Sequence, residues 1–344
     1  MKKLVSVIMS VHNEKEEHLR LAVESICKQT YDNIELILID DASDEECKAV
    51  IYSLISKWRQ IKLLQNTTNI GLTASLNRAL RVASGDYIAR MDADDYSTPD
   101  RITKQVEFLD RRNEVDICGT GVISFGATQI FMSPHSGLDP KQAQCRLFYS
   151  STLCHPSVMM RKSFLDKHNI EYDEAVLKGQ DYDMWERCSV YGNLAVLKEV
   201  LLYYRIHNSQ ISFLNKDQQE NSANIVRLRR LGRLGIKPTD REFKCHLALI
   251  SGKSSEILPK EVNIWTQKLI KANKEKQLVD ARTFEIDLDN RFFIFCLKMR
   301  KYSVFANIKY WYVFIRIICY RILMSIKLNS HRKIINKLTN NVDL

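Results

Sequence analysis

The 344 residues, 45% of them hydrophobic, are enough for one large domain or two moderate ones with a core, and nothing marks the chain as disordered, fibrous or repetitive. The nine cysteines are scattered, odd in number and never spaced as CxxC, which argues against a zinc site or a disulfide framework and fits a reducing cytoplasm. From Arg291 to the end the chain has eleven Lys or Arg and one acid, Asp343, which accounts for the whole net charge of +10, so the neutral remainder gives no reason to expect nucleic-acid binding.

The N-terminus is predicted to be a strand and not a signal peptide. Two lysines in MKKLVSVIMS are followed by only a short apolar run, at 4–9. A signal peptide needs a longer apolar core and a small-residue cleavage site.

Strand and helix patterns alternate as far as residue 91. Strands are predicted at 4–9, 34–39, 61–65 and 87–91, and helices over 16–29, from Ser43 or Asp44, and from Gly71 or Leu72 to Ser84-Gly85. Short connections between such elements imply a parallel, doubly wound α/β sheet, whose ligands lie outside the carboxyl ends of the strands. His12, Asp41 and the acids from Asp92 to Asp95 all follow strands, so we expect them to converge on one crevice.

The pattern becomes less regular after this point. A helix from Pro99 to Arg112 and β-structure over 115–126 are predicted next. The segment 127–212 is mixed, and 216–290 is mostly helical and polar, with a fold that the pattern does not define.

The stretch YIARMDADD places Asp92, Asp94 and Asp95 directly after an apolar strand. Neighbouring carboxylates repel one another and lose solvation when they are buried. A solvated loop or a helix N-cap would explain them without a ligand. Carboxylates are also the ligands that Mg²⁺ and Mn²⁺ prefer, and such ions bridge proteins to substrate phosphates. A divalent cation and a diphosphate would therefore explain why the charges are tolerated.

Four segments together resemble the family 2 glycosyltransferases: VSVIMSVHNE, IELILIDDASDE, NTTNIGLTASLNRALRVASGDYIARMDADD and GQDYDMWERC. The resemblance covers about residues 1–212. It implies the GT-A fold, a Rossmann-like, mostly parallel sheet flanked by helices, and inverting transfer of a hexosyl or N-acetylhexosaminyl group from a UDP-sugar with Mn²⁺ or Mg²⁺.

The resemblance also implies an organisation of the chain. It makes 1–95 the nucleotide-sugar-binding half and 96–212 the acceptor-binding and catalytic half of one GT-A domain. A helical extension is expected over 213–290 and a basic amphipathic tail over 291–344.

Site residues follow from the same resemblance. The implied nucleotide-binding residues are Ser10, Val11, His12, Asp41, Asn69, Gly71 and Asp92. Asp41 would accept a hydrogen bond from the uracil N3–H, whereas Asp40 is expected to cap the strand end. Many relatives have an aromatic residue at the position of His12, which leaves base stacking open there.

The implied metal ligands are Asp94 and His207, and Asp95 is expected either to support them or to cap the following helix. Arg205 would lie with His207 on a loop that closes over the diphosphate, where a cation stabilises the leaving group.

An inverting transfer also needs a base to take the proton of the acceptor hydroxyl. The resemblance assigns this role to Asp181, with Asp183 as a supporting or capping residue, and the alternative is that Asp181 only caps its helix. His155 is expected either in the acceptor pocket or as a buried structural histidine.

The tail segment KYSVFANIKYWYVFIRIICYRILMSIKL, residues 301–328, combines aromatic and aliphatic residues with regularly spaced cations. Its longest uncharged run, 302–308, is far shorter than the roughly 20 residues of a spanning helix. An amphipathic helix lying on an anionic membrane is predicted, with a helix packed on the catalytic domain as the alternative. A glycan or lipid-linked glycan acceptor, a cytoplasmic location at the inner face of the cell membrane, and no nucleic-acid partner are the corresponding expectations.

Two other functions compete with glycosyl transfer. A nucleotidylyltransferase would carry a glycine-rich, basic phosphate loop after the first strand, whereas SVHNEKEE is acidic and lacks glycine. A catalytically inactive, membrane-associated protein that binds sugar nucleotides would have no need of the full set Asp92, Asp94 and Asp181.

Overall fold

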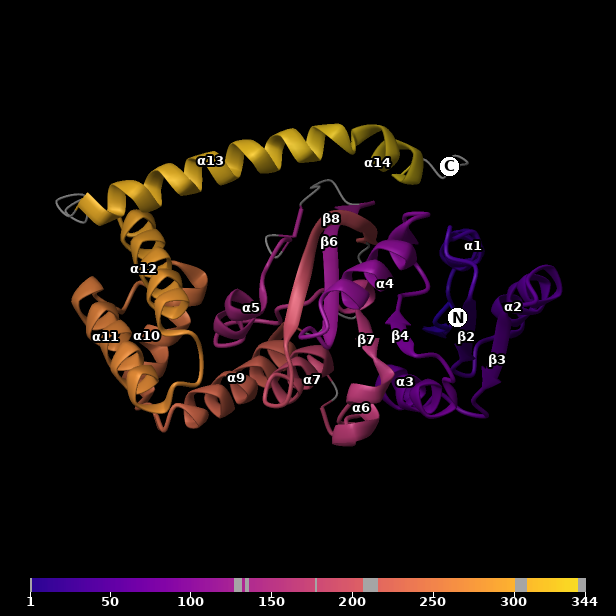
Figure 1. The fold of residues 1–344 in the computed structure, drawn as a ribbon, viewed down its shortest axis with the longest axis horizontal. Helices are drawn as coiled ribbons and strands as arrows, with labels where there is room; N and C mark the ends of the chain where they lie inside the picture. The colour runs from indigo at the N-terminus through magenta and orange to yellow at the C-terminus, as the bar shows by residue number, and fades with distance from the viewer. Residues whose placement is uncertain are drawn as a thin grey trace. The chain divides into compact units, whose positions relative to one another are not determined.

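The computed structural model describes residues 2–126, 132–133, 136–176, 178–206, 216–300 and 308–339 (Figure 1). The chain divides into two compact units. The first unit comprises Met1–Pro140, Ser151–Ser222 and His331–Leu344, and the second comprises Lys141–Ser150 and Ala223–Ser330.

Within the described part of the first unit, eight strands form one mixed sheet in the order β3-β2-β1-β4-β7-β6-β8-β5. The strands are β1 (Val5–Val11), β2 (Ile34–Asp40), β3 (Ile61–Gln65), β4 (Tyr87–Arg90), β5 (Tyr96–Ser97), β6 (Ile117–Phe125), β7 (Met159–Arg161) and β8 (Leu194–Arg205). The first four strands are parallel, while β7 runs antiparallel to β4 and β6, and β5 runs antiparallel to β8. The predicted GT-A sheet, mostly parallel and flanked by helices, is confirmed.

The helices of the first unit cover this sheet. They are α1 (Glu16–Cys27), α2 (Glu45–Lys57), α3 (Gly71–Val82), α4 (Arg101–Arg111), α6 (Lys162–His168), α7 (Gln180–Cys188) and α14 (Arg332–Thr339), with a 3₁₀ turn, η1 (His155–Ser157). Leu36 and Leu38 of β2 belong to the core shared with α1 and α2. Ile37 and Ile39 alternate with them and are also buried, because α3 contacts β1 and β2 on the other face.

The starts of α2 and α4 differ in how well local sequence patterns predict them. Asp44 caps α2, because its side chain accepts a hydrogen bond from the Cys47 N–H at 2.9 Å. It is one of the two residues, Ser43 and Asp44, that were predicted as the cap. Helix α4 begins at Arg101 and not at Pro99 as predicted. The Pro99 carbonyl accepts a hydrogen bond from the Thr30 N–H at 2.8 Å, so it is engaged outside the helix.

The second unit is helical in its described part. It contains most of α5 (Pro140–Arg146) and α9 (Lys216–Arg233), together with α10 (Asp240–Ser251), α11 (Pro259–Lys276), α12 (Ala281–Lys298) and α13 (Ile308–Ser330). Helices α10, α11 and α12 contact one another around buried Leu249, Trp265 and Phe284 (Figure 1). His246 lies in the same core, and burial lowers its pKa to about 3, so it is neutral.

None of the described helices combines the length and the apolar character that crossing a membrane requires.

The turn that leads from α3 into β4 depends on a residue without a side chain. A Cβ atom at Gly85 would lie 2.6 Å from the backbone nitrogen of Ser6 and 2.9 Å from the Leu4 carbonyl oxygen. Both atoms belong to the backbone at the start of β1 and cannot move without disturbing the sheet.

We therefore expect Gly85→Ala to destabilise the protein by about 2 kcal/mol, which lowers Tm by about 4–8 °C in a thermal melt. Gly232→Ala is the control, because no atom lies within 4 Å of the added Cβ and alanine favours the helix α9. A melt of Gly85→Ala that coincides with the wild type would contradict this account of the turn.

Candidate active site

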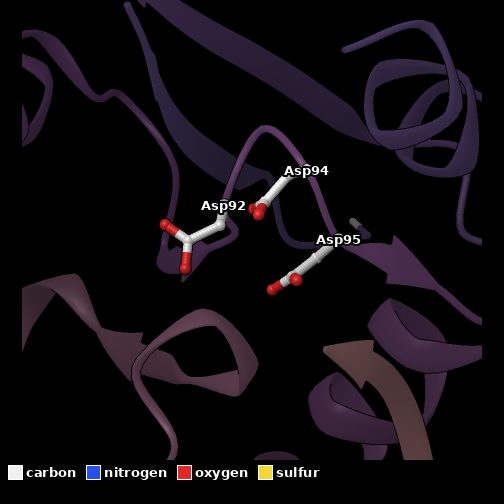
Figure 2. Close-up of side chains that lie close together, drawn as sticks. All are labelled: Asp92, Asp94 and Asp95. Atoms are coloured by element: carbon white, nitrogen blue, oxygen red, sulfur yellow. The ribbon is translucent and has the colours of Figure 1, made fainter. Parts of the chain in front are cut away.

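Three carboxylates gather in the loop of residues 91–95 between β4 and β5, which we call the acidic loop. Oxygen atoms of Asp92, Asp94 and Asp95 all lie within 4.8 Å of one another. Figure 2 shows the chain arching from Asp92 to Asp95, with the three side chains close together. Loops without any ion also bring acids together, so the surroundings of each side chain decide what this cluster can bind.

The end of β8 holds the acidic loop in place. Strand β5 pairs with β8 directly after the loop, with Tyr96 opposite Tyr203. The Arg205 N–H donates a hydrogen bond to Asp95 Oδ1 at 2.9 Å, and its Nε donates to the Asp94 carbonyl at 2.8 Å. The guanidinium also lies over the Phe125 ring, 4.5 Å from its centroid. The structure thus brings the predicted Arg205 to the predicted metal-binding loop.

Asp95 is fully buried, and within the described residues its Oδ2 atom has no hydrogen-bond donor. Burial raises the pKa of Asp95 well above its ordinary value, and the charges of Asp94 and Asp92 raise it further. A buried carboxylate oxygen without a donor, beside two more carboxylates, is a donor set that suits a hard divalent cation. The residues present therefore fit the Mn²⁺ or Mg²⁺ ion that the sequence predicts.

Arg90 holds Asp92 from the other side. Its Nη1 atom donates to Asp92 Oδ2 at 2.8 Å and its Nη2 atom to Oδ1, a two-point contact from a fully buried guanidinium at the end of β4. Burial raises the pKa of Asp92, and the Arg90 charge opposes that rise. No role was predicted for Arg90, although a charged residue within the otherwise apolar strand YIARM is an unusual feature.

Asp181 lies in the first turn of α7, and its Oδ2 atom accepts a hydrogen bond from Ser151 Oγ at 2.9 Å. The N-cap of α7 is Gly179, with φ of +77°, so Asp181 does not occupy the cap position, although the backbone N–H groups of Asp181 and Tyr182 in the first turn also lower its pKa. Burial raises the pKa of Asp181, while the Ser151 hydrogen bond and the Arg90 charge lower it. Asp181 is thus within electrostatic reach of the arginine that holds Asp92. The sequence did not indicate that Ser151 contacts Asp181, because the two residues are distant from each other in the chain.

Two other predicted residues make structural contacts. Asp183 is buried and forms an ion pair with Arg187 Nε at 2.8 Å, one turn further along α7. His155 Nε2 lies 2.8 Å from the Tyr172 hydroxyl, and its ring packs edge-on against Trp185. Burial lowers the pKa of His155 well below its ordinary value, so it is a neutral, structural histidine. His207, the other predicted metal ligand, lies outside the described residues.

The predicted nucleotide-side residues meet at the ends of β1 and β2. Asp41 Oδ1 accepts a hydrogen bond from the Ile70 N–H and Oδ2 accepts one from the Gly71 N–H, both at 2.9 Å. Asn69 Oδ1 accepts from the same Gly71 N–H at 3.0 Å. Asp41 therefore orders the chain that enters α3, a role that the sequence did not suggest.

The first strand joins the same group. The Asp41 N–H donates to the Val11 carbonyl at 2.8 Å, and His12 Nδ1 lies 2.9 Å from the Asp41 carbonyl oxygen. His12 is exposed and Ser10 is partly buried. Asp40 caps the strand end as predicted, since its Oδ1 accepts from the Ser43 N–H at 2.9 Å.

The strand order explains why these groups face the acidic loop. Strands β2, β1 and β4 are neighbours and run parallel, so their carboxyl ends lie at one edge of the sheet. Glu14, in the loop after β1, is close enough to help raise the pKa of Asp92. The expected convergence of three separate segments is therefore present.

Comparisons with known proteins agree with this geometry. Residues 6–168 match the family described as Glycosyl transferase family 2. An uncharacterized glycosyltransferase of Methanocaldococcus jannaschii is 31% identical over 211 residues, which cover 60% of this chain and 72% of that protein. The O-antigen biosynthesis glycosyltransferase WbnJ of Escherichia coli is 30% identical over 214 residues, covering 60% of this chain and 80% of WbnJ.

Among solved structures, residues 1–349 of S. aureus TarS in complex with UDP-GlcNAc have the same fold. The TM-score is 0.58 at 17% identity, and the match covers 87% of this chain and 92% of that one. Both of these relatives are named as glycosyltransferases. By its sequence and its GT-A fold, the chain is an enzyme that belongs to glycosyltransferase family 2.

Proposed function

We propose that the protein is a metal-dependent, inverting glycosyltransferase that transfers a hexosyl or N-acetylhexosaminyl group from a UDP-sugar. The acceptor in this proposal is a glycan or lipid-linked glycan in cell-surface polysaccharide synthesis, at the cytoplasmic face of the membrane. The observation that carries the proposal is the acidic loop, with three carboxylates within 4.8 Å and a buried Asp95 oxygen that has no donor in the described structure. The structures of TarS with UDP-GlcNAc and the role of WbnJ in O-antigen biosynthesis support the donor and the pathway class.

Asp94 and Asp95 are the residues that would hold the cation. In this position a Mn²⁺ or Mg²⁺ ion would supply Lewis-acid stabilisation of the charge that develops on the diphosphate leaving group. Arg90 fixes the Asp92 carboxylate by a two-point contact, and its charge opposes the rise that burial causes in the pKa of Asp92. Arg205, held against Asp94 and Asp95, places a positive charge beside the same loop.

Asp181 is the base in this mechanism. It takes the proton from the acceptor hydroxyl as that oxygen bonds to the anomeric carbon and the bond from this carbon to the diphosphate oxygen breaks. Attack from the face opposite the leaving group inverts the configuration. Burial raises the pKa of Asp181, which makes its carboxylate a stronger base than an ordinary aspartate, and the Ser151 hydrogen bond and the Arg90 charge oppose that rise.

A first prediction concerns the donor and the cation. With a panel of UDP-sugars, a glycan or lipid-linked glycan acceptor and Mn²⁺, we expect release of UDP, and EDTA should reduce it by about 10²-fold or more. Added Mn²⁺ in excess of the chelator restores the rate. Full activity in EDTA would contradict the metal, and persistent absence of UDP release with acceptor extracts would favour a protein that binds sugar nucleotides without turnover.

A second prediction separates the two groups of carboxylates. Asp181→Asn removes the base and should lower kcat by about 10²-fold or more, with UDP affinity changed less than about twofold. Asp94→Ala should weaken Mn²⁺-dependent UDP binding by about tenfold or more, measured by calorimetry. Equal loss of UDP binding in both variants would contradict these roles.

A third prediction concerns pH. Because burial raises the pKa of Asp181, the rate should fall on the acid side at a higher pH than for an ordinary aspartate. The Ser151 hydrogen bond stabilises the charged carboxylate, so Ser151→Ala should raise the pKa of Asp181 and shift this acid limb upward. The measurement is the pH profile of kcat/KM, with Ser189→Ala, which removes a hydroxyl bonded to the Glu186 carbonyl on α7, as the control. A shift to lower pH in Ser151→Ala would contradict the assignment of the base.

A further inference from the structure

Helix α13 has one apolar face that is packed inside the second unit. Tyr310 and Val313 are buried with Phe293 of α12, and the Tyr310 and Phe293 rings stack with centroids 5.5 Å apart. Phe314 and Ile317 extend this contact along the same face. The core of the unit thus accounts for part of the apolar content of α13.

A second apolar face of α13 is exposed. We define the outer stripe as Trp311, Ile315, Ile318, Ile322 and Ile326, which follow one another at intervals of four, three, four and four residues. This spacing aligns them along one face of a helix. Each has between 42% and 59% of its surface exposed. Isolated exposed apolar residues are ordinary, but a continuous stripe of five large ones marks an interaction surface.

The outer stripe lies in a strongly basic segment. Helix α13 contains Lys309, Arg316, Arg321 and Lys327 and no Asp or Glu, and the sequence has no acid from Arg291 to Val342. Arg316 and Arg321 are exposed. By helical spacing Arg316 lies to one side of the stripe and Arg321 to the other. An apolar stripe between basic borders is the arrangement of helices that lie in a membrane interface.

The charge and the apolar character of α13 indicate which kind of partner its exposed face can bind. Helix α13 is not apolar enough to cross a membrane. A second copy of the chain would bring two basic segments together, and like charges at such a contact oppose association. A nucleic acid would engage the cations but would leave the isoleucines exposed to water. An anionic lipid surface accepts both features, because the stripe enters the acyl boundary while the cations meet lipid phosphates.

We propose that the outer stripe of α13 docks the protein on an anionic membrane surface. The helix that follows connects this anchor to the sheet that carries the site. His331, the first residue after α13, contacts the hydroxyl of Tyr203 through Nδ1, and Ile335 and Leu338 of α14 are buried. Tyr203 lies on β8, two residues before Arg205. His331 and α14 thus belong to the first unit, together with the strand that holds the acidic loop.

The test is co-sedimentation of the full chain with vesicles of phosphatidylglycerol and phosphatidylethanolamine, with phosphatidylcholine vesicles for comparison. The stripe variant is Ile315→Glu with Ile322→Glu, each 55% exposed in the native chain. Its matched control is Ile225→Glu with Ile264→Glu, on α9 and α11, which are 65% and 59% exposed. A third variant, Arg316→Gln with Arg321→Gln, removes charge and leaves the stripe intact.

The wild type and the control should bind the anionic vesicles with equal affinity. Both should bind phosphatidylcholine vesicles about tenfold more weakly. The stripe variant should bind the anionic vesicles at least about tenfold more weakly. The charge variant should bind anionic vesicles about tenfold more weakly than the wild type, with little change in its binding to neutral vesicles. Added salt should weaken the binding of the wild type to anionic vesicles in the same way.

Wild-type protein that stays in the supernatant with anionic vesicles would overturn the proposal, as would a stripe variant that sediments like the wild type. Gel filtration distinguishes the competing occupant. A wild-type dimer that the stripe variant converts to monomers, with no change in vesicle binding, would assign the stripe to a second copy of the chain.

Discussion

The mutual repulsion of the carboxylates in the acidic loop is the constraint on which the site depends. Asp92, Asp94 and Asp95 lie within 4.8 Å of one another, one of them fully buried. Isolated charges at such a distance, removed from water, would neutralise or move apart. They stay together because β5 pairs with β8, the Arg205 N–H anchors Asp95, and Arg90 holds Asp92. The fold therefore holds three carboxyl groups together at a strand end, where a divalent cation would favour their ionised forms.

Arg90 links this loop to the opposite side of the proposed reaction. Its guanidinium is fully buried and binds Asp92 directly, and its charge also lowers the pKa of Asp181. Burying an arginine is costly unless it is paired, so the two-point contact at the end of β4 pairs Arg90 and fixes the geometry of Asp92. One buried cation therefore acts on both Asp92 and Asp181, although the two acids are distant in the sequence.

Local patterns were sufficient to predict the elements that place the site. The alternation of strands and helices to residue 91 predicted β1 to β4, and the acids at the first turn of α2 predicted its cap at Asp44 or its neighbour. The predicted start of α4 was wrong because the Pro99 carbonyl accepts a tertiary hydrogen bond from the Thr30 N–H. No local sequence pattern contains that contact. The same limit explains Ser151 and the loop-ordering role of Asp41, since both depend on which segments meet after folding. For His155 the sequence left two alternatives open, the acceptor pocket and a buried structural histidine, and its burial against Tyr172 and Trp185 agrees with the second.

The central claim is that the acidic loop binds a divalent cation against the donor diphosphate, and anomalous diffraction tests it most directly. Crystals grown with UDP and Mn²⁺ would be measured at an X-ray energy near the manganese absorption edge. The account predicts an anomalous peak in coordination contact with carboxylate oxygens of Asp94 or Asp95 and with the UDP phosphates. A manganese peak elsewhere on the chain, or UDP bound with no peak at this loop, would contradict it.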